Sequence, residues 1–370
     1  MRGVAVRCTT AFVCGFFPAL AVSSAVWLVA VPSKGHGSDF VTFWGAGHAV
    51  LHGDSPYPQL SSLPTHAGRL FAPFVYPPVA AFMFAPFALL PLAVAKLIYV
   101  ALSLGAVGLA LRLLGVRDWR CYGAAYGTAP LFAATVIGTI SPLLLLGVAA
   151  AWRYRDRAVA LGLLVAYLVT AKLFLWPLWL WLVRTRRFRA AALSAVAGVV
   201  AVAGSWAGIG FAGLRDYPEL LRRLSGLTGV HSYSLYALGI GRAVPVLTVL
   251  ALAAAGLLLR KDAHLLVAAL GVALLATPIL WPHYLVLLFV PLALARRTFS
   301  VAWLAPLVLW LDSAAWSDSA IRIVVLFALL GAGLAWVLAV YSDESPRAGT
   351  VRERGSSPVY SLRWMFSQGS

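Results

Sequence analysis

Acidic residues are scarce in this sequence, and charged residues as a class are few. Its 370 residues include only 12 Asp and Glu against 29 Lys and Arg, and charged residues make up 11% of the chain. A soluble domain is roughly a quarter charged and about half apolar, whereas this chain is 62% hydrophobic with a mean hydropathy of +0.88. A soluble fold cannot hide so much apolar sequence from water. The composition therefore excludes a soluble enzyme and a disordered chain.

Cysteine is also rare, and phosphate-binding loop motifs are missing. The 3 cysteines are scattered along the chain, at Cys8, Cys14 and Cys121, so they predict no disulfide framework. The sequence contains no glycine-rich phosphate loop, no Walker motif and no soluble nucleotide-binding domain. A nucleotide-linked substrate is therefore disfavoured.

What is present is a series of long apolar runs. They lack the two-residue alternation of barrel strands, so the sequence predicts an all-α polytopic membrane protein of about twelve transmembrane helices. The run 77–91 is broken by prolines and is interpreted as an interfacial or re-entrant helix. The predicted spans are 10–31, 92–114, 123–139, 140–152, 158–171, 173–183, 190–210, 242–260, 264–280, 282–295, 299–311 and 321–341.

The basic residues predict the orientation of the chain in the membrane. The net charge of +17 would suit a nucleic-acid partner, but Lys and Arg also collect in the cytoplasmic loops of membrane proteins. With both termini in the cytoplasm of a plasma-membrane protein, most Lys and Arg fall on the inner side. The transmembrane domain is then 1–341, its long outer loops are 32–76 and 211–241, and 342–370 is a disordered cytoplasmic tail. No nucleic-acid partner is predicted.

The first outer loop carries the most informative stretch, Ser38–Tyr57. Its apolar and aromatic residues recur at helical spacing, which predicts an amphipathic helix on the membrane surface that stops near Gly53. Ser38 or Asp39 occupies the position of an N-cap, and Asp39 is either this cap or a catalytic base at the bilayer edge. His48 and His52 lie four residues apart, but two histidines alone are a weak signal for a metal, and no metal site is predicted.

Lys172 is the second unusual residue, because it interrupts an apolar run. A charge in such a run is costly and favours a functional role, and the alternative is a side chain that reaches out to the headgroups. Tyr76, which precedes two prolines, is a candidate hydroxyl facing a substrate.

Four blocks of sequence carry a resemblance to a known family. In order they are SDF…HGDSPY, VYPPVAAFMFAPFALLP, AKLFLWPLWLWLVRTRRFRAA and TPILWPHY. Together they resemble glycosyltransferase family 87, the polyprenyl-phosphate-mannose-dependent mannosyltransferases and their relatives. The resemblance covers roughly residues 10–340 and implies the C-type glycosyltransferase fold, with the catalytic loop after the first span.

The resemblance implies a membrane enzyme that moves a hexose, mannose by family default, from a polyprenyl phosphate to a lipid or glycan acceptor on the extracytoplasmic face. Asp39 matches the catalytic aspartate of the family. A phosphate leaving group needs no general acid, so one carboxylate suffices for inverting transfer. No cofactor besides the lipid-linked donor is expected. The expected substrate-binding residues are Lys172 for the phosphate, with Tyr76, His231, His283, Trp281, Asp54 and Tyr57.

Two other classes of protein stay open at this point. About twelve spans and an intramembrane lysine also suit a transporter or flippase, although the chain has no repeat symmetry and its outer loops are unequal. The second alternative is a non-catalytic relative that binds polyprenyl lipids in the envelope.

Overall fold

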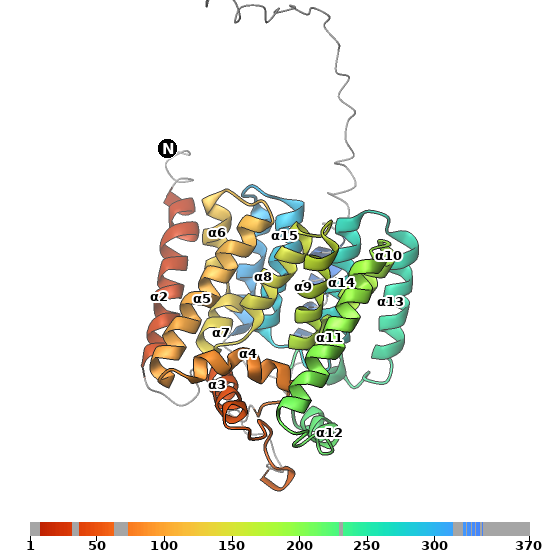
Figure 1. Cartoon of the computed structure of the whole chain (residues 1–370). Helices are drawn as coiled ribbons and strands as arrows, with labels where there is room; N and C mark the ends of the chain where they lie inside the picture. Colours follow the sequence, from red (N-terminus) through yellow and green to blue (C-terminus); the bar gives the residue numbers. More distant parts are fainter. Residues whose placement is uncertain are drawn as a thin grey trace, which may run out of the picture.

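The computed structural model describes residues 8–31, 37–62, 73–228 and 232–313, together with part of the segment 321–335. Within those ranges every regular element is a helix, and no β-strand occurs. This confirms the all-α class (Figure 1). The predicted tail 342–370 lies outside the described residues, as does His231.

Three helices are long and apolar enough to cross a bilayer. They are Cys8–Ala30, which contains the π-helical turn η1 (Phe12–Phe16) and α2 (Phe17–Ala30), then α5 (Leu92–Leu113), and α11 (Phe188–Gly208). A helix of about 20 residues spans the hydrocarbon core of a membrane. Only about a third or less of each is buried inside the protein, so the apolar remainder is left to lipid. These helices match the predicted spans at 10–31, 92–114 and 190–210.

The predicted span 123–139 is not one helix. It is divided between α6 (Trp119–Tyr126) and α7 (Ala129–Ile137), with a break at Gly127 and Thr128 before the helix-starting Pro130. α7 then meets α8 (Ser141–Arg153) at a bend of 119°. Gly138 ends α7 in the left-handed region, at φ 75°, which favours glycine. The α7–α8 pair is thus a broken span or a re-entrant loop.

The other helices are shorter than a full span, and several of them are apolar. The twelve-span count therefore stays a prediction. These helices are α9 (Ala158–Ala171), α10 (Pro177–Arg184), α13 (Val244–Leu258), α14 (Asp262–Ala276), α15 (Phe289–Ala295) and α16 (Trp310–Ser313), with the 3₁₀ helices η2 (Leu60–Ser62), η3 (Leu173–Leu175), η5 (Leu235–Leu238), η6 (Pro282–Leu288) and η7 (Val301–Leu309).

The helices that belong to the polar loops gather at one end of the bundle. Figure 1 shows α3 (Ser38–Leu51), α4 (Pro78–Ala88) and α12 (Tyr217–Thr228) at this end, and the start of the first span at the opposite end. The described parts of the two long polar segments of the sequence therefore lie at one end of the bundle, and the side of the membrane that this end faces stays a prediction. We call this end the Asp39 end. The turns that follow α8 and α10 lie at the opposite end and are rich in arginine. We call this end the arginine end.

Candidate active site

Asp39 is the second residue of α3, and the helix begins differently from the prediction. Gly37, not Ser38 or Asp39, is the N-cap, with φ 71°, and no side chain caps the helix. The N–H of Gly37 donates to the carbonyl oxygen of Val136 at 2.7 Å, which fixes the start of α3 against the end of α7. The predicted stop at Gly53 is confirmed by its φ of 77°. The carboxylate of Asp39 therefore does not cap the helix.

The apolar face of α3 packs into the protein. Phe40 and Phe43 are both 1% exposed. Phe43 stacks on Phe84 of α4 with ring centroids 4.4 Å apart, and Phe40 lies 4.8 Å from the ring of Tyr99. At Gly47 an added Cβ would lie 2.9 Å from backbone atoms of α4. The helix therefore rests on α4 with backbones in close approach, and this packing fixes the position of Asp39.

Lys172 follows the last residue of α9 and turns inward. It is 8% exposed, so it does not reach out to the headgroups, and that alternative is wrong. Its Nζ donates to the hydroxyl oxygens of Tyr76 and Tyr284, each at 2.7 Å. The same ammonium lies 4.5 Å and 4.6 Å from the two ring centroids. Two tyrosines from distant segments thus hold one buried ammonium group.

Asp39 and Lys172 are close enough to interact electrostatically. Burial raises the pKa of the Asp39 carboxyl to about 6, and the charge of Lys172 acts in the opposite direction. Among the residues that the structure describes, none donates a hydrogen bond to Asp39. A carboxylate with a pKa near neutrality and unoccupied oxygens is suited to accept a proton from a bound hydroxyl.

Tyr57 contacts the backbone of the segment that carries Tyr76. Its hydroxyl donates to the backbone carbonyl oxygen of Tyr76 at 2.7 Å, and its ring stacks on Trp206 with centroids 5.4 Å apart. Tyr217 does the same for the neighbouring residue, donating to the carbonyl oxygen of Val75 at 2.8 Å. Tyr57 thus holds the backbone of the segment that carries Tyr76. Its hydroxyl proton is occupied in this hydrogen bond.

His283 lies beside the two tyrosines. It is 4% exposed, its ring centroid is 4.7 Å from that of Tyr284, and its Nδ1 has no hydrogen-bond partner in the described part of the chain. A buried ring nitrogen without a partner is unusual and marks a place where a ligand hydroxyl would fit. Trp281 precedes it and is half-buried.

Asp54 lies away from this group. It is exposed and follows the far end of α3, about 18 Å along the helix axis from Asp39. His48 and His52 are also exposed, with rings stacked 4.3 Å apart. Within the described ranges no three His, Cys, Asp or Glu side chains come together as a candidate metal site.

Two residues of this end were not singled out from the sequence. Tyr284 is one, and its place directly after His283 in the block TPILWPHY was an available signal. Lys96 is the other. Its Nζ would lie 3.4 Å from a Cβ added at Gly37, and it interrupts an apolar run as Lys172 does. The intramembrane-charge argument made for Lys172 applies equally to it.

Comparison with known proteins shows to which family the chain belongs. The sequence model of glycosyltransferase family 87 matches residues 74–278, which is more than half of the chain. This range includes Tyr76 and Lys172, whereas Asp39 and His283 fall outside it. No curated protein and no solved structure shows a significant match. With its apolar spanning helices and this match over more than half of its length, the chain belongs to glycosyltransferase family 87 and is a membrane glycosyltransferase.

Proposed function

We propose that this glycosyltransferase moves a hexose, mannose in the first instance, from a polyprenyl phosphate to a hydroxyl of a lipid or glycan acceptor. We place the reaction at the Asp39 end, on the extracytoplasmic side of the plasma membrane. The observation that carries the proposal is that the Asp39 carboxylate, which has no hydrogen-bond donor among the described residues, lies near enough to the buried ammonium group of Lys172 to interact with it electrostatically.

Asp39 acts as the general base in this proposal. The acceptor oxygen attacks the anomeric carbon from the side opposite the phosphate, and its proton passes to the Asp39 carboxylate. The new C–O bond forms as the bond from the anomeric carbon to the phosphate oxygen breaks, so the configuration inverts. The electron pair leaves on the phosphate, which needs no proton donor, and this agrees with a site that offers a single carboxylate.

Lys172 receives the charge of the leaving group. An ammonium group has three N–H donors, and two of those on Lys172 go to Tyr76 and Tyr284. One donor is left for the departing phosphate oxygen. The tyrosine hydroxyls accept from Lys172 through their oxygens and keep their own protons, which can bind sugar oxygens or the phosphate. His283, with its vacant Nδ1, is a further contact for a sugar hydroxyl.

A transfer assay tests the proposal. Purified protein is incubated with radiolabelled polyprenyl-phosphate mannose and host lipid extract, beside the variants Asp39→Asn and Asp216→Asn. Asp216 is an exposed carboxylate at the same end, so its variant controls for the loss of one negative charge. We expect label in the acceptor with wild type and with Asp216→Asn, and a loss on the order of 10³-fold with Asp39→Asn.

The same assay separates the other classes of protein. A flippase or lipid-binding relative would give no transfer with any polyprenyl-phosphate sugar while still binding the lipid. Transfer from a different sugar donor would keep the reaction and replace mannose. Full transfer by Asp39→Asn would rule out Asp39 as the general base.

A further inference from the structure

A pocket at the arginine end is lined by four arginines together with Ala158, Phe188 and Ala190. It measures about 300 Å³ and lies where the turn between α8 and α9 meets the turn between α10 and α11. Its lining includes Arg155, Asp156, Arg186, Arg187 and Arg189, so four positive charges face one negative charge. The proposed transfer chemistry, at the other end of the bundle, makes no use of it.

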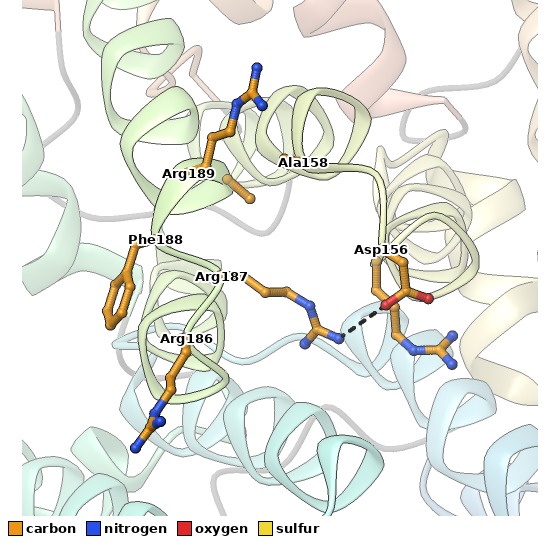
Figure 2. A pocket seen from close by; sticks show the side chains of 8 residues that line it. Asp156, Ala158, Arg186, Arg187, Phe188 and Arg189 are labelled. Atoms are coloured by element: carbon orange, nitrogen blue, oxygen red, sulfur yellow. Dashed lines mark ion pairs between the residues drawn. The ribbon is translucent and has the colours of Figure 1, made fainter.

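Two of the four arginines are already neutralised within the fold. Arg187 donates to both carboxylate oxygens of Asp262, at 2.9 Å and 2.7 Å, and Arg155 lies 3.4 Å from the same carboxylate. Arg187 also lies 3.7 Å from Asp156, and Figure 2 shows it directed toward that residue. These two side chains form the wall of the pocket.

Arg186 and Arg189 are different. Both are exposed, and neither has an ion-pair partner among the described residues. Figure 2 shows them extending to opposite sides, with Phe188 between them. Arg186 holds a φ of 59°, a left-handed conformation that costs a non-glycine residue energy. The turn therefore carries two guanidinium groups without ion-pair partners among the described residues, one on each side of Phe188, and both residues belong to the lining of the pocket.

The backbone adds positive potential at the same place. The 21-residue helix α11 begins at Phe188, and no side chain caps its N-terminus. Its first N–H groups lack intrahelical acceptors and carry the positive end of the helix dipole. The helix dipole thus adds to the positive potential of the arginines, although a helix N-terminus alone would not define a binding site.

The surroundings identify the kind of anion. Phe188 is 60% exposed, and apolar side chains continue away from the pocket along α9 and α11, with Val159 and Leu163 each 53% exposed and Val196 62%. Where these helices cross, a Cβ at Gly162 would lie 2.9 Å from the carbonyl oxygen of Ala190, so no acyl chain passes between them. The charged pocket is thus continuous with an outward-facing apolar surface, which suits a headgroup joined to acyl chains better than a free anion.

We propose that this pocket binds the phosphate of an anionic phospholipid headgroup in the leaflet at the arginine end. Arg186 and Arg189 turn onto the phosphate, and the acyl chains lie along Phe188 and the apolar face of α9 and α11. The site would anchor α11 and α9 at that membrane surface. The proposal stands apart from the proposed sugar transfer.

Native mass spectrometry of the full chain in detergent tests this. The probes are dioleoyl phosphatidylglycerol and dioleoyl phosphatidylcholine, titrated separately. We expect tighter binding of phosphatidylglycerol, and a roughly thirtyfold loss of that affinity in the double variant Arg186→Gln/Arg189→Gln. The matched control is Arg153→Gln/Arg157→Gln, which removes two exposed arginines from the neighbouring turn, and we expect it to retain affinity within about threefold.

Three results would overturn the proposal. Equal losses in the two double variants would mean diffuse attraction to surface charge. Equal affinity for the two lipids would mean no headgroup site. Displacement of phosphatidylglycerol by inorganic phosphate at matched concentration would indicate a small-anion site in place of a lipid site. The single variants Arg186→Gln and Arg189→Gln, each expected to lose several-fold, serve if the double variant does not fold.

Discussion

Two aspartates of this protein have opposite surroundings. Asp118, between α5 and α6, accepts hydrogen bonds from the side chain and backbone N–H of Arg120 and from the N–H of Phe299. The bond to the Arg120 side chain is the main cause that lowers the pKa of Asp118 to about 2. Asp39 has no donor among the described residues, and burial raises its pKa to about 6.

The difference separates a carboxylate that holds parts of the fold together from one whose surroundings suit the proposed base. At the arginine end, Asp262 likewise accepts from Arg187 and from the indole N–H of Trp181, at 2.7 Å, so its charge holds three helices together. The Asp118 carboxylate, whose pKa is about 2, stays charged near neutral pH. At the Asp39 end the carboxylate is left poorly stabilised, as a general base requires.

After Asp39→Asn, the largest expected effect comes from removing the cation at the Asp39 end. Lys172→Met should lower transfer on the order of a hundredfold, since the leaving phosphate loses its counter-charge. It should also raise the pKa of Asp39, because Lys172 lowers it. Since the deprotonated carboxylate is the active form, the acid limb of the rate should move to higher pH.

The charge-preserving variant Lys172→Arg sharpens this result. It should lose rate, because a planar guanidinium does not fit between two tyrosine hydroxyls as an ammonium does, but its acid limb should stay where it is. An acid limb that is the same in wild type and Lys172→Met would contradict the coupling of the two residues.

At the arginine end we expect loss of stability without loss of chemistry. Asp262→Asn leaves Arg187 and Arg155 without their carboxylate and should cost about 2–3 kcal/mol, seen as a lower Tm in nanodiscs. Asp156→Asn is the control, because that carboxylate is 80% exposed and 3.7 Å from Arg187, and it should change stability by less than about 0.5 kcal/mol. A transfer rate per folded molecule that falls with Asp262→Asn would break the comparison.

A pair of glycines in α3 tests how the helix is held. Gly47→Ala would place a Cβ 2.9 Å from the backbone of α4, so we expect a cost of about 1–3 kcal/mol and a lower rate as α3 shifts. At Gly45 an added Cβ meets nothing within 4 Å, and Gly45→Ala should be neutral or stabilise by up to about 1 kcal/mol. Thermal unfolding and transfer of both variants are measured together, and equal behaviour would argue against the close approach.

The smallest expected effect concerns the support of Tyr76. Tyr57→Phe removes the donor to its backbone carbonyl oxygen and should cost about 1 kcal/mol, with a rate loss of a few-fold. Tyr154→Phe is the control, since the Tyr154 hydroxyl has no hydrogen-bond partner in the described ranges, and it should leave Tm and rate unchanged. A greater rate loss than with Lys172→Met would instead make Tyr57 a substrate contact.

Two residues of the proposed site can be picked out from the sequence because charges are so rare there. Asp39 and Lys172 stand out against an apolar background, and the structure brings them together. The N-cap was misassigned because Ser38 and Asp39 are common caps, whereas the hydrogen bond from Gly37 to α7 is a tertiary contact that no local pattern reports.

The rest depended on long-range contacts. Lys172 contacts Tyr76 and Tyr284, which lie 96 and 112 residues away in the sequence. Hydropathy carries no information on such long-range contacts. The break inside 123–139 was hidden for a related reason. Apolar runs on both sides of Gly127 look continuous to a hydropathy window, although the chain changes direction there.

The pH dependence of kcat/KM, measured for wild type and Asp39→Asn on the same polyprenyl-phosphate donor, tests the central claim most directly. The account predicts that the wild-type value rises with pH, reaches half of its plateau near pH 6, where the Asp39 carboxyl is half deprotonated, and levels off at higher pH. It predicts that Asp39→Asn shows on the order of 10⁻³ of the rate and no such rise. A variant that keeps the wild-type rate, or the same rise near pH 6, would contradict it.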